Sequence, residues 1–455
     1  MSENRRLAEL LQDSMRRHNV TGAALALIKD GVLSSATGGT VNIDTGYPVL
    51  PKTWFAAGSV TKVFTATLVM MLVDQGAVDL DAPVATYIED FALADRDASQ
   101  LVTVRMLLNH TSGLPGNFML DLPKSPEMVQ QQVARLATFD FNSRPGELWS
   151  YSNAGLATLG RIVEVVTKQT WDAALTSMLL KPAGIKGSSI TEEMMLHSVA
   201  VGHNVDPTTG ATTRTDRFQI DTCNGPTGAT LWCDVEGLAA FGQLHLNGGR
   251  SSEGEQLLSV HSVAEMQREQ AGVPWAVGVD KWGLGWSIRY SNGHTVLSHT
   301  GANAGAHSTL IVLPEQQGVI ALMANSSSGV ALTTELGALL LSEDFDVLAP
   351  EAPQAPGSPP TVDVTPYLGS YVADDAAAEV SVRDGALVVE QINSPELSRE
   401  LLSMGFAPPV PVELTAYAPD GRFVAASGMP ISFVTPQWSE RPEYMYIGRV
   451  FRRVA

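Results

Sequence analysis

The segment from Ser59 to Gln75 constrains the fold of this chain more than any other. Its helical pattern is apolar on most faces, and it is followed by Gly76, a residue type that often closes helices. A helix with so little polar surface must be buried on all sides. We therefore expect this helix at the centre of a domain, and 455 residues leave room for two or more domains.

The bulk composition narrows the class of protein. Apolar residues make up 44% of the chain and charged residues 17%, which is typical of a well-buried globular protein. A formal net charge of -19 argues against nucleic-acid partners and against docking on anionic membrane, because both surfaces attract basic proteins. No apolar run approaches the length of a membrane span.

The first twenty residues have an amphipathic helical pattern without the apolar core of a secretory signal. We therefore expect a cytoplasmic protein. The chain has only two cysteines, Cys223 and Cys233, and we expect two reduced thiols there, although the number also allows one disulfide.

The hydrophobic pattern predicts an α/β (α+β) domain over residues 1–348. Runs at 23–28 and 32–36 flank a Gly-containing turn and predict a β-hairpin. Residues 100–260 are mostly helical and loop-like, with helices expected at 127–136, 154–166 and 235–246. Antiparallel strands are expected at 285–290, 294–297, 308–313 and 318–324, followed by a helix at about 330–341. The hairpin and the late strands could form one sheet with helices on its faces.

A Pro-rich stretch, residues 349–362, predicts a semi-rigid linker to a second domain. Beyond it, residues 363–455 contain short strand-like runs at 379–382, 386–389, 412–417, 423–425, 431–434 and 444–451. Such spacing is typical of a small antiparallel barrel or sandwich.

The first chemical motif is Ser59-Val60-Thr61-Lys62. At the start of a helix, this spacing puts the serine and the lysine on one face. A buried lysine with a lowered pKa can take the proton of a serine and make it a nucleophile. Chance is the alternative, because a chain of this length should hold roughly one or two such matches. However, Lys62 is the only lysine here with a serine three residues before it.

Two further motifs follow. In Tyr151-Ser152-Asn153, a tyrosine beside a lysine ammonium would be biased toward phenolate and could move protons, and Asn153 could orient a carbonyl. A packed aromatic and a helix cap are the simpler interpretations. His299-Thr300-Gly301-Ala302 is expected at the end of a strand, where the amides of Ser59 and Ala302 could form an oxyanion hole. His299 could bind a carboxylate or pass a proton, or it could be a surface histidine at a turn.

The order and spacing of these motifs resemble the serine β-lactamase and penicillin-binding-protein superfamily, especially its class C-like branch, over residues 1 to about 345. The segment from Leu107 to Leu114 and Pro145-Gly146 fit the same branch. The resemblance implies Ser59 as nucleophile, Lys62 and Tyr151 as the base system and Asn153 as orienter. It also implies His299 in place of the usual lysine, with Thr300 and Gly301 at the substrate. In this family His110 is mainly structural.

The resemblance leaves several cytoplasmic activities open: an esterase, a D-aminopeptidase-like amidase, a biosynthetic transacylase, or a non-turnover sensor. The layout is most similar to stand-alone penicillin-binding-protein-type thioesterases, which cyclise a peptide taken from a carrier protein and carry a lipocalin-like β-domain. This implies a peptidyl or small acyl ester or thioester as substrate and a peptidyl carrier protein as partner.

Two further residues are candidates for binding the substrate. The resemblance implies that Arg449 reaches the active site from the C-terminal domain, whereas a solvated strand residue is the simpler interpretation. Trp232 could wall an apolar acyl pocket or pack in the core. We expect no cofactor and no metal, since the histidines and cysteines lack ligand spacing.

Overall fold

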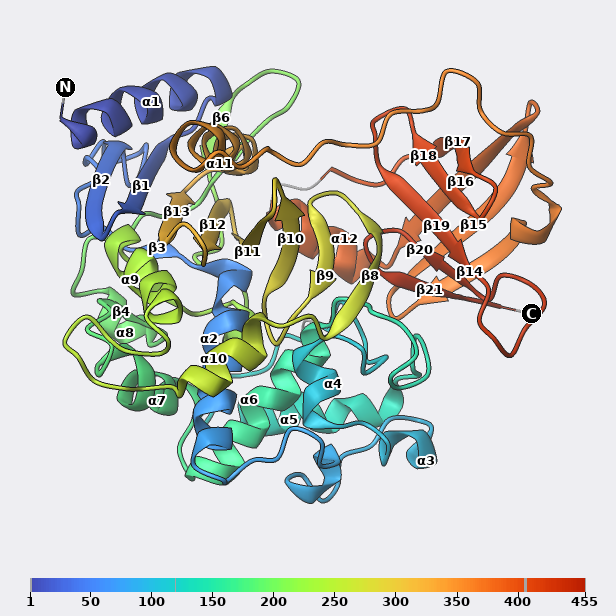
Figure 1. Cartoon of the computed structure of the whole chain (residues 1–455), viewed down its shortest axis with the longest axis horizontal. Coiled ribbons are helices and arrows are strands. Elements are labelled where there is room, and N and C mark those ends of the chain that lie inside the picture. The colour runs from blue at the N-terminus through green and yellow to red at the C-terminus, as the bar shows by residue number, and fades with distance from the viewer. Residues whose placement is uncertain (1, 119, 405–406, 455) are drawn as a thin grey trace.

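The computed structural model describes residues 2–118, 120–404 and 407–454. An eight-stranded antiparallel sheet forms its centre, in the order β2-β1-β13-β12-β11-β10-β9-β8 (Figure 1). The N-terminal hairpin therefore joins the late strands, with Ala23 of β1 opposite Ala324 of β13. The strands are β1 (Gly22–Lys29), β2 (Val32–Gly39), β8 (Ala271–Ala276), β9 (Val279–Trp282), β10 (Ser287–Ser291), β11 (His294–Asn303), β12 (Ala306–Leu313) and β13 (Gly318–Ala324).

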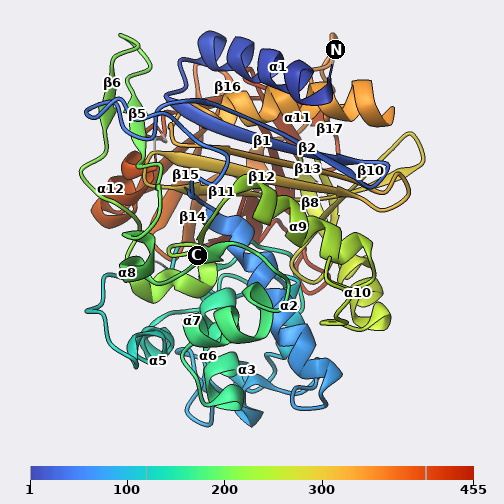
Figure 2. The same cartoon turned by 90° about the vertical axis from the view of Figure 1, so that its left-hand side faces the viewer.

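Helices cover both faces of this sheet, as Figure 2 shows. On one face lie α1 (Glu3–His18) and α11 (Gly329–Phe345), which share an apolar cluster with the sheet. On the other face lies a helical lobe around α2 (Thr61–Asp74). Every residue from Thr61 to Leu72 is buried, which confirms the central position predicted for this helix.

The remaining elements of the lobe are short, apart from α6 and α9. The helices are α3 (Arg96–Ser99), α4 (Val104–Leu108), α5 (Met128–Ala134), α6 (Asn153–Thr167), α7 (Trp171–Ala174), α8 (Thr191–Met194), α9 (Val235–Leu246) and α10 (Val260–Gln267). The small strands are β3 (Phe55–Ala56), β4 (Gly187–Ser188), β5 (His203–Val205), β6 (Thr212–Arg214) and β7 (Trp232–Cys233). Cys223 and Cys233 are both buried and free.

The C-terminal part is a closed eight-stranded barrel, which confirms the predicted fold class. Its strands are β14 (Gly369–Ala373), β15 (Ala376–Arg383), β16 (Ala386–Asn393), β17 (Val412–Ala418), β18 (Arg422–Ala425), β19 (Pro430–Val434), β20 (Tyr444–Tyr446) and β21 (Val450–Arg453). One helix, α12 (Pro395–Ser403), is inserted between β16 and β17 and lies between the barrel and the sheet (Figure 1).

Three sequence expectations differ from the structure. The strand expected at 294–297 continues to Asn303, so His299 lies within β11 and not at its end. The single run expected at 444–451 is two strands, because residues 447–449 form a turn. The sequence pattern also missed β8, β9, β14 and α12.

The barrel is packed against the helical lobe through an apolar contact. Trp149 and Trp282 share a cluster with Tyr444, Tyr446 and Val450 of the barrel. Around it, the Tyr444 hydroxyl donates to Glu147 Oε2 at 2.7 Å, and Val450 N–H donates to Ser150 Oγ at 3.2 Å.

Across the described ranges, none of the helices has both the length and the hydrophobicity that crossing a bilayer requires.

Candidate active site

Ser59 lies in a tight turn that leads into α2. Residues 58–60 form a single 3₁₀ turn, and Gly58 has a positive φ of 52°. A Cβ atom on Gly58 would lie 2.7 Å from the nitrogen of Ala302, so the turn packs directly on β11. Glycine at this position thus lets the serine sit against the strand.

Lys62 is the second residue of α2, and its amine lies beside the serine. Its Nζ is 3.0 Å from Ser59 Oγ and donates to the carbonyl of Thr227. The side chain is only 1% exposed, and burial, helped by the charge of Arg449, lowers the pKa of Lys62 well below its usual value. A neutral amine can accept the Ser59 proton, which is the chemistry predicted from the sequence.

Tyr151 completes this cluster, in a different protonation state from the one expected. Its ring centre is 5.0 Å from Lys62 Nζ, and its hydroxyl is hydrogen-bonded to Ser59. Burial raises the pKa of Tyr151, although the Ser59 bond and the Arg449 charge both oppose the shift. The expected bias toward phenolate is wrong, because burial, the main cause of the shift, disfavours the charged phenolate. Tyr151 is a phenol that can relay a proton.

Asn153 is the first residue of α6 and lines the same cavity as Ser59. The helix cap is not Asn153 but Ser152, whose Oγ accepts from Gly155 N–H at 3.0 Å. His110 lies below this loop, and its Nδ1 accepts from Ser152 N–H at 3.1 Å. Both bonds hold Ser152, the middle residue of the Tyr151-Ser152-Asn153 segment, and the residues on either side of it line the cavity.

The backbone around Ser59 is packed closely enough for an oxyanion hole. A Cβ on Gly301 would lie 2.2 Å from Ala57 O and 2.9 Å from Ser59 N, so β11 approaches the serine amide directly. Ser59 and Ala302 both line the cavity. Their pairing as oxyanion donors remains a prediction, and this packing supports it.

The side chains of the motif His299-Thr300-Gly301-Ala302 differ from what the sequence led us to expect. His299 is 5% exposed, and burial, with the Lys62 charge second, lowers the pKa of His299 to about 3. A neutral imidazole cannot attract a carboxylate by charge, which corrects that part of the expectation. Thr300 is exposed, and neither it nor Gly301 is among the described residues that line the cavity.

The structure also corrects the interpretation of Trp232 as a pocket wall. Trp232 is 1% exposed and stacks on Phe218 with ring centres 4.8 Å apart. It belongs to a core cluster with Trp54 and Met194, and it is not one of the described residues around the cavity.

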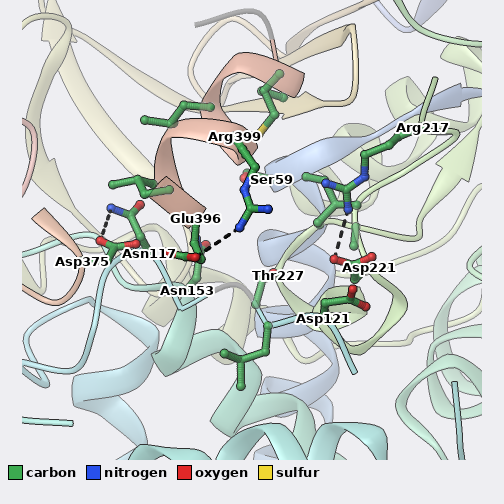
Figure 3. Close-up of a pocket in the computed structure, with 18 of the residues that line it drawn as sticks. Ser59, Asn117, Asp121, Asn153, Arg217, Asp221, Thr227, Asp375, Glu396 and Arg399 are labelled. Carbon is green, nitrogen blue, oxygen red and sulfur yellow. Dashed lines mark hydrogen bonds and ion pairs between the residues drawn. The ribbon is translucent and has the colours of Figure 1, made fainter. Parts of the chain in front are cut away.

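The cavity in front of Ser59 has a volume of about 670 Å³ (Figure 3). Its walls come from the lobe, from β11, from the β14–β15 turn and from α12. They consist of Ser59, Asn117, Leu120, Asp121, Tyr151, Asn153, Arg217, Ile220, Asp221, Thr227, Gly228, Ala229, Ala302, Asp375, Glu396, Leu397, Arg399, Leu401, Met404 and Arg449. The serine therefore opens into a cavity that the C-terminal barrel helps to form.

Arg449 reaches this cavity from the turn between β20 and β21, so it is not a solvated strand residue. Its guanidinium carbon is 5.8 Å from the Tyr151 ring centre. It packs on Gly116, where a Cβ would lie 2.7 Å from Arg449 Cδ. Only glycine at that position leaves room for the arginine.

Sequence reasoning missed the residues that α12 and the β14–β15 turn contribute, chiefly Asp375, Leu397 and Leu401. A signal was present in Ser394-Pro395, since a serine cap followed by proline starts many helices. In the structure Leu397 N–H donates to Ser394 Oγ at 3.1 Å. Among the described side chains, no group of three or more His, Cys, Asp or Glu is arranged to hold a metal ion.

Comparisons with known proteins agree with this geometry. The family model described as Beta-lactamase matches residues 7–342. Penicillin-binding protein 4 of Amycolatopsis lactamdurans is 36% identical over 369 residues, which are 80% of this chain and 97% of that protein. Esterase EstB of Burkholderia gladioli is 31% identical over 197 residues, 40% of this chain and 50% of EstB.

Among solved structures, the crystal structure of SurE superposes with a TM-score of 0.81 at 28% identity, covering 99% of both chains. A second structure, SurE with D-Leu, gives a TM-score of 0.78 at the same identity. The likeness to SurE therefore includes the C-terminal barrel.

Proposed function

Because the chain belongs to the beta-lactamase family of serine hydrolases and acyltransferases, we propose that it is a stand-alone peptide cyclase. It takes a peptidyl group from a carrier-bound thioester onto Ser59 and releases it as a macrolactam. Ser59, Lys62 and Tyr151 perform the chemistry, Asn153 orients the acyl group, and Arg449 acts on the substrate from the barrel.

Acylation follows from the geometry of the serine and lysine. Ser59 Oγ attacks the thioester carbonyl while its proton passes to the neutral amine of Lys62. The C–S bond then breaks, and the thiol leaves with that proton, relayed through Tyr151. The amides of Ser59 and Ala302 hold the oxyanion between these steps.

Release reverses the same proton path. The amine at the other end of the peptide, after losing one proton to solvent, forms a C–N bond with the acyl carbon. The C–O bond to Ser59 breaks, and the second amine proton returns to Ser59 Oγ through Lys62 and Tyr151. Hydrolysis would use water in place of the amine, so exclusion of water decides the product.

The observation that carries this proposal is the contribution of the barrel to the cavity of Ser59. Helix α12 and Arg449 form part of the wall of a cavity of about 670 Å³, which has room for several residues of a folded-back peptide. The full-length likeness to SurE, which has been solved with D-Leu, supports a D-amino acid at the acyl position.

The test offers the protein a peptidyl thioester mimic that ends in a D-residue. We expect a product lighter than the linear acid by one water, identified by mass spectrometry as the ring. The same peptide with an acetylated amino terminus serves as control and should yield only linear acid. If the free-amine peptide also yields linear acid and no ring, the cyclase proposal is wrong.

A second candidate is a small-molecule esterase, favoured by the 31% identity with EstB over part of the chain. It uses the same acyl-enzyme, and it predicts fast turnover of short acyl esters with water as the acceptor. A kcat/KM for a short ester that exceeds the value for the peptidyl thioester by about tenfold or more would favour the esterase.

A further inference from the structure

A smaller cavity of about 250 Å³ lies behind Arg449, between the lobe, the barrel and α12. It shares Asn117, Leu397, Leu401 and Arg449 with the cavity in front of Ser59. The two cavities are therefore adjacent, and Arg449 stands at their junction. The smaller one is lined by Asn117, Asn142, Ala373, Asp374, Ala376, Gln391, Leu397, Leu401, Ile447, Gly448, Arg449 and Phe451.

Two charged side chains in this cavity have buried atoms without a hydrogen-bond partner among the described residues. These atoms are Asp374 Oδ1 and Arg449 Nη1. A buried charged group left without a partner costs free energy, so native proteins seldom leave such atoms unmatched. One oxygen of Asp374 thus lacks a donor and one nitrogen of Arg449 lacks an acceptor, while Asn142 also interacts with the Asp374 carboxylate.

The carboxylates beside Arg449 are fixed in place by the lobe. Asp374 Oδ2 accepts from the N–H groups of Gly116 and Asn117, which ties the β14–β15 turn to the lobe. The next residue, Asp375, accepts from Asn117 Nδ2 at 3.3 Å and lines the cavity that contains Ser59 (Figure 3). Burial, and then the charge of Asp374, raises the pKa of Asp375 to about 6.

We infer that Asp374, Asp375 and Arg449 form the subsite for the amino-terminal residue of the substrate peptide. The α-ammonium lies against the two carboxylates, and the carbonyl oxygen of the same residue accepts from Arg449. This inference rests on the proposed function and names the group that holds the attacking amine.

The chemistry of the site favours this occupant over the alternatives. An ammonium supplies donors to Asp374 Oδ1 and to Asp375, and the neighbouring carbonyl supplies the acceptor that Arg449 Nη1 lacks. A free carboxylate would be repelled by the two aspartates, and an apolar chain would leave both atoms unmatched. Because Asp375 faces the cavity of Ser59, an amine held there is within the space that contains the acyl group.

The test compares two acceptors for the acyl-enzyme formed from an activated ester. One is an amino acid amide, which carries an ammonium next to a carbonyl, and the other is the matching α-hydroxy acid amide. We expect Asp375→Asn to raise the KM for the amine acceptor about tenfold or more, the scale of one lost charged hydrogen bond. The KM for the hydroxy acceptor should rise less than the KM for the amine acceptor, because a hydroxyl brings no positive charge to the carboxylate. Denaturant unfolding of Asp375→Asn and of the wild type checks separately that the variant is folded.

Asp121→Asn is the matched control, because it removes one negative charge from the same large cavity. An equal rise in KM for Asp121→Asn, or an unchanged KM for Asp375→Asn, would overturn the inference while leaving the cyclase proposal intact. If the wild-type protein transfers its acyl group to neither acceptor and forms no ring, the proposed function itself fails.

Discussion

Lys62 makes no ion pair among the described residues, and the charge that acts on its pKa is that of another cation, Arg449. Burial and the charge of Arg449 both act to lower the pKa of Lys62. A group with a lowered pKa is neutral, and here competent as a base, above that pKa. Acylation of Ser59 should therefore be lost as the pH falls through the pKa of Lys62.

Arg449→Met tests this coupling. Without the guanidinium, one of the two causes that lower the pKa of Lys62 is gone, so the acid limb of the acylation rate should move to higher pH. The rate is measured in single turnovers of an activated ester across a pH series. Arg452→Met, an exposed residue on the neighbouring strand, should leave the limb in place. If the acid limb of the acylation rate stays at the same pH in Arg449→Met, or moves to lower pH, the assigned effect of Arg449 on the pKa of Lys62 is contradicted.

The residues nearest the reaction could be predicted from the sequence because their spacing is local. Ser59 and Lys62 are one helical turn apart, and Tyr151 and Asn153 belong to a single short loop. Their protonation states could not be predicted, since burial depends on the whole fold. Burial is the main cause both of the raised pKa of Tyr151 and of the lowered pKa of His299.

At the scale of elements, α12 has the largest effect on the shape of the site. Leu397 is buried in the barrel core, and Leu401 packs against that core while lining both cavities. The helix thus couples the barrel to the wall that faces Ser59. Under the proposed function, Leu397 and Leu401 exclude water from the space in which the amine reaches the acyl group.

Leu401→Ala should raise the ratio of linear acid to ring several-fold, because a smaller side chain lets water into the cavity. The rate of Ser59 acylation should change little, since Leu401 is remote from the base system. Leu402→Ala is the control on the same helix, where the side chain is 51% exposed. The products are quantified by chromatography and mass spectrometry. Equal product ratios for the two variants would contradict a water-excluding role for α12.

The sequence predicted most of the long elements but missed this helix. Apolar runs bounded by turn residues identified β1, β12 and β13, and a helical pattern identified α11. Helix α12 has only nine residues and directly follows the strand-like run of β16, so the period changes within a short stretch. Strands β8 and β9 have a shifted register between Gly272 and Ala276, which breaks the alternation that identifies strands.

For the whole molecule, the position of the barrel has the largest effect on the candidate active site. A Pro-rich linker alone would allow the two parts to move independently, and only the family resemblance implied that Arg449 of the barrel reaches the active site. The docking depends on contacts between distant residues, such as Trp149 and Trp282 with Tyr444 and Tyr446, which no local pattern reveals. The barrel is therefore part of the active site, because it supplies Arg449, Asp375 and α12.

Glu147→Ala should loosen this docking. The Tyr444 hydroxyl is buried and donates to Glu147, so its loss of an acceptor should cost about 1–3 kcal/mol of stability. Denaturant unfolding of the wild type and of Glu147→Ala measures the difference in their free energies of unfolding. Glu440→Ala, at an exposed position in the same barrel, is the control and should cost less than about 0.5 kcal/mol. A Glu147→Ala protein as stable as the control would show that this contact does not hold the barrel in place.

The central claim is that the peptidyl group passes through an ester on Ser59. The most direct measurement is the mass of the intact protein after rapid mixing with a peptidyl thioester mimic, followed by mapping of the modified fragment. We predict a transient gain of one acyl group on the fragment that carries Ser59, which decays as product forms, and no gain in Ser59→Ala. An adduct on another residue, or full turnover by Ser59→Ala, would contradict the account, and an adduct that never decays would indicate a sensor instead of an enzyme.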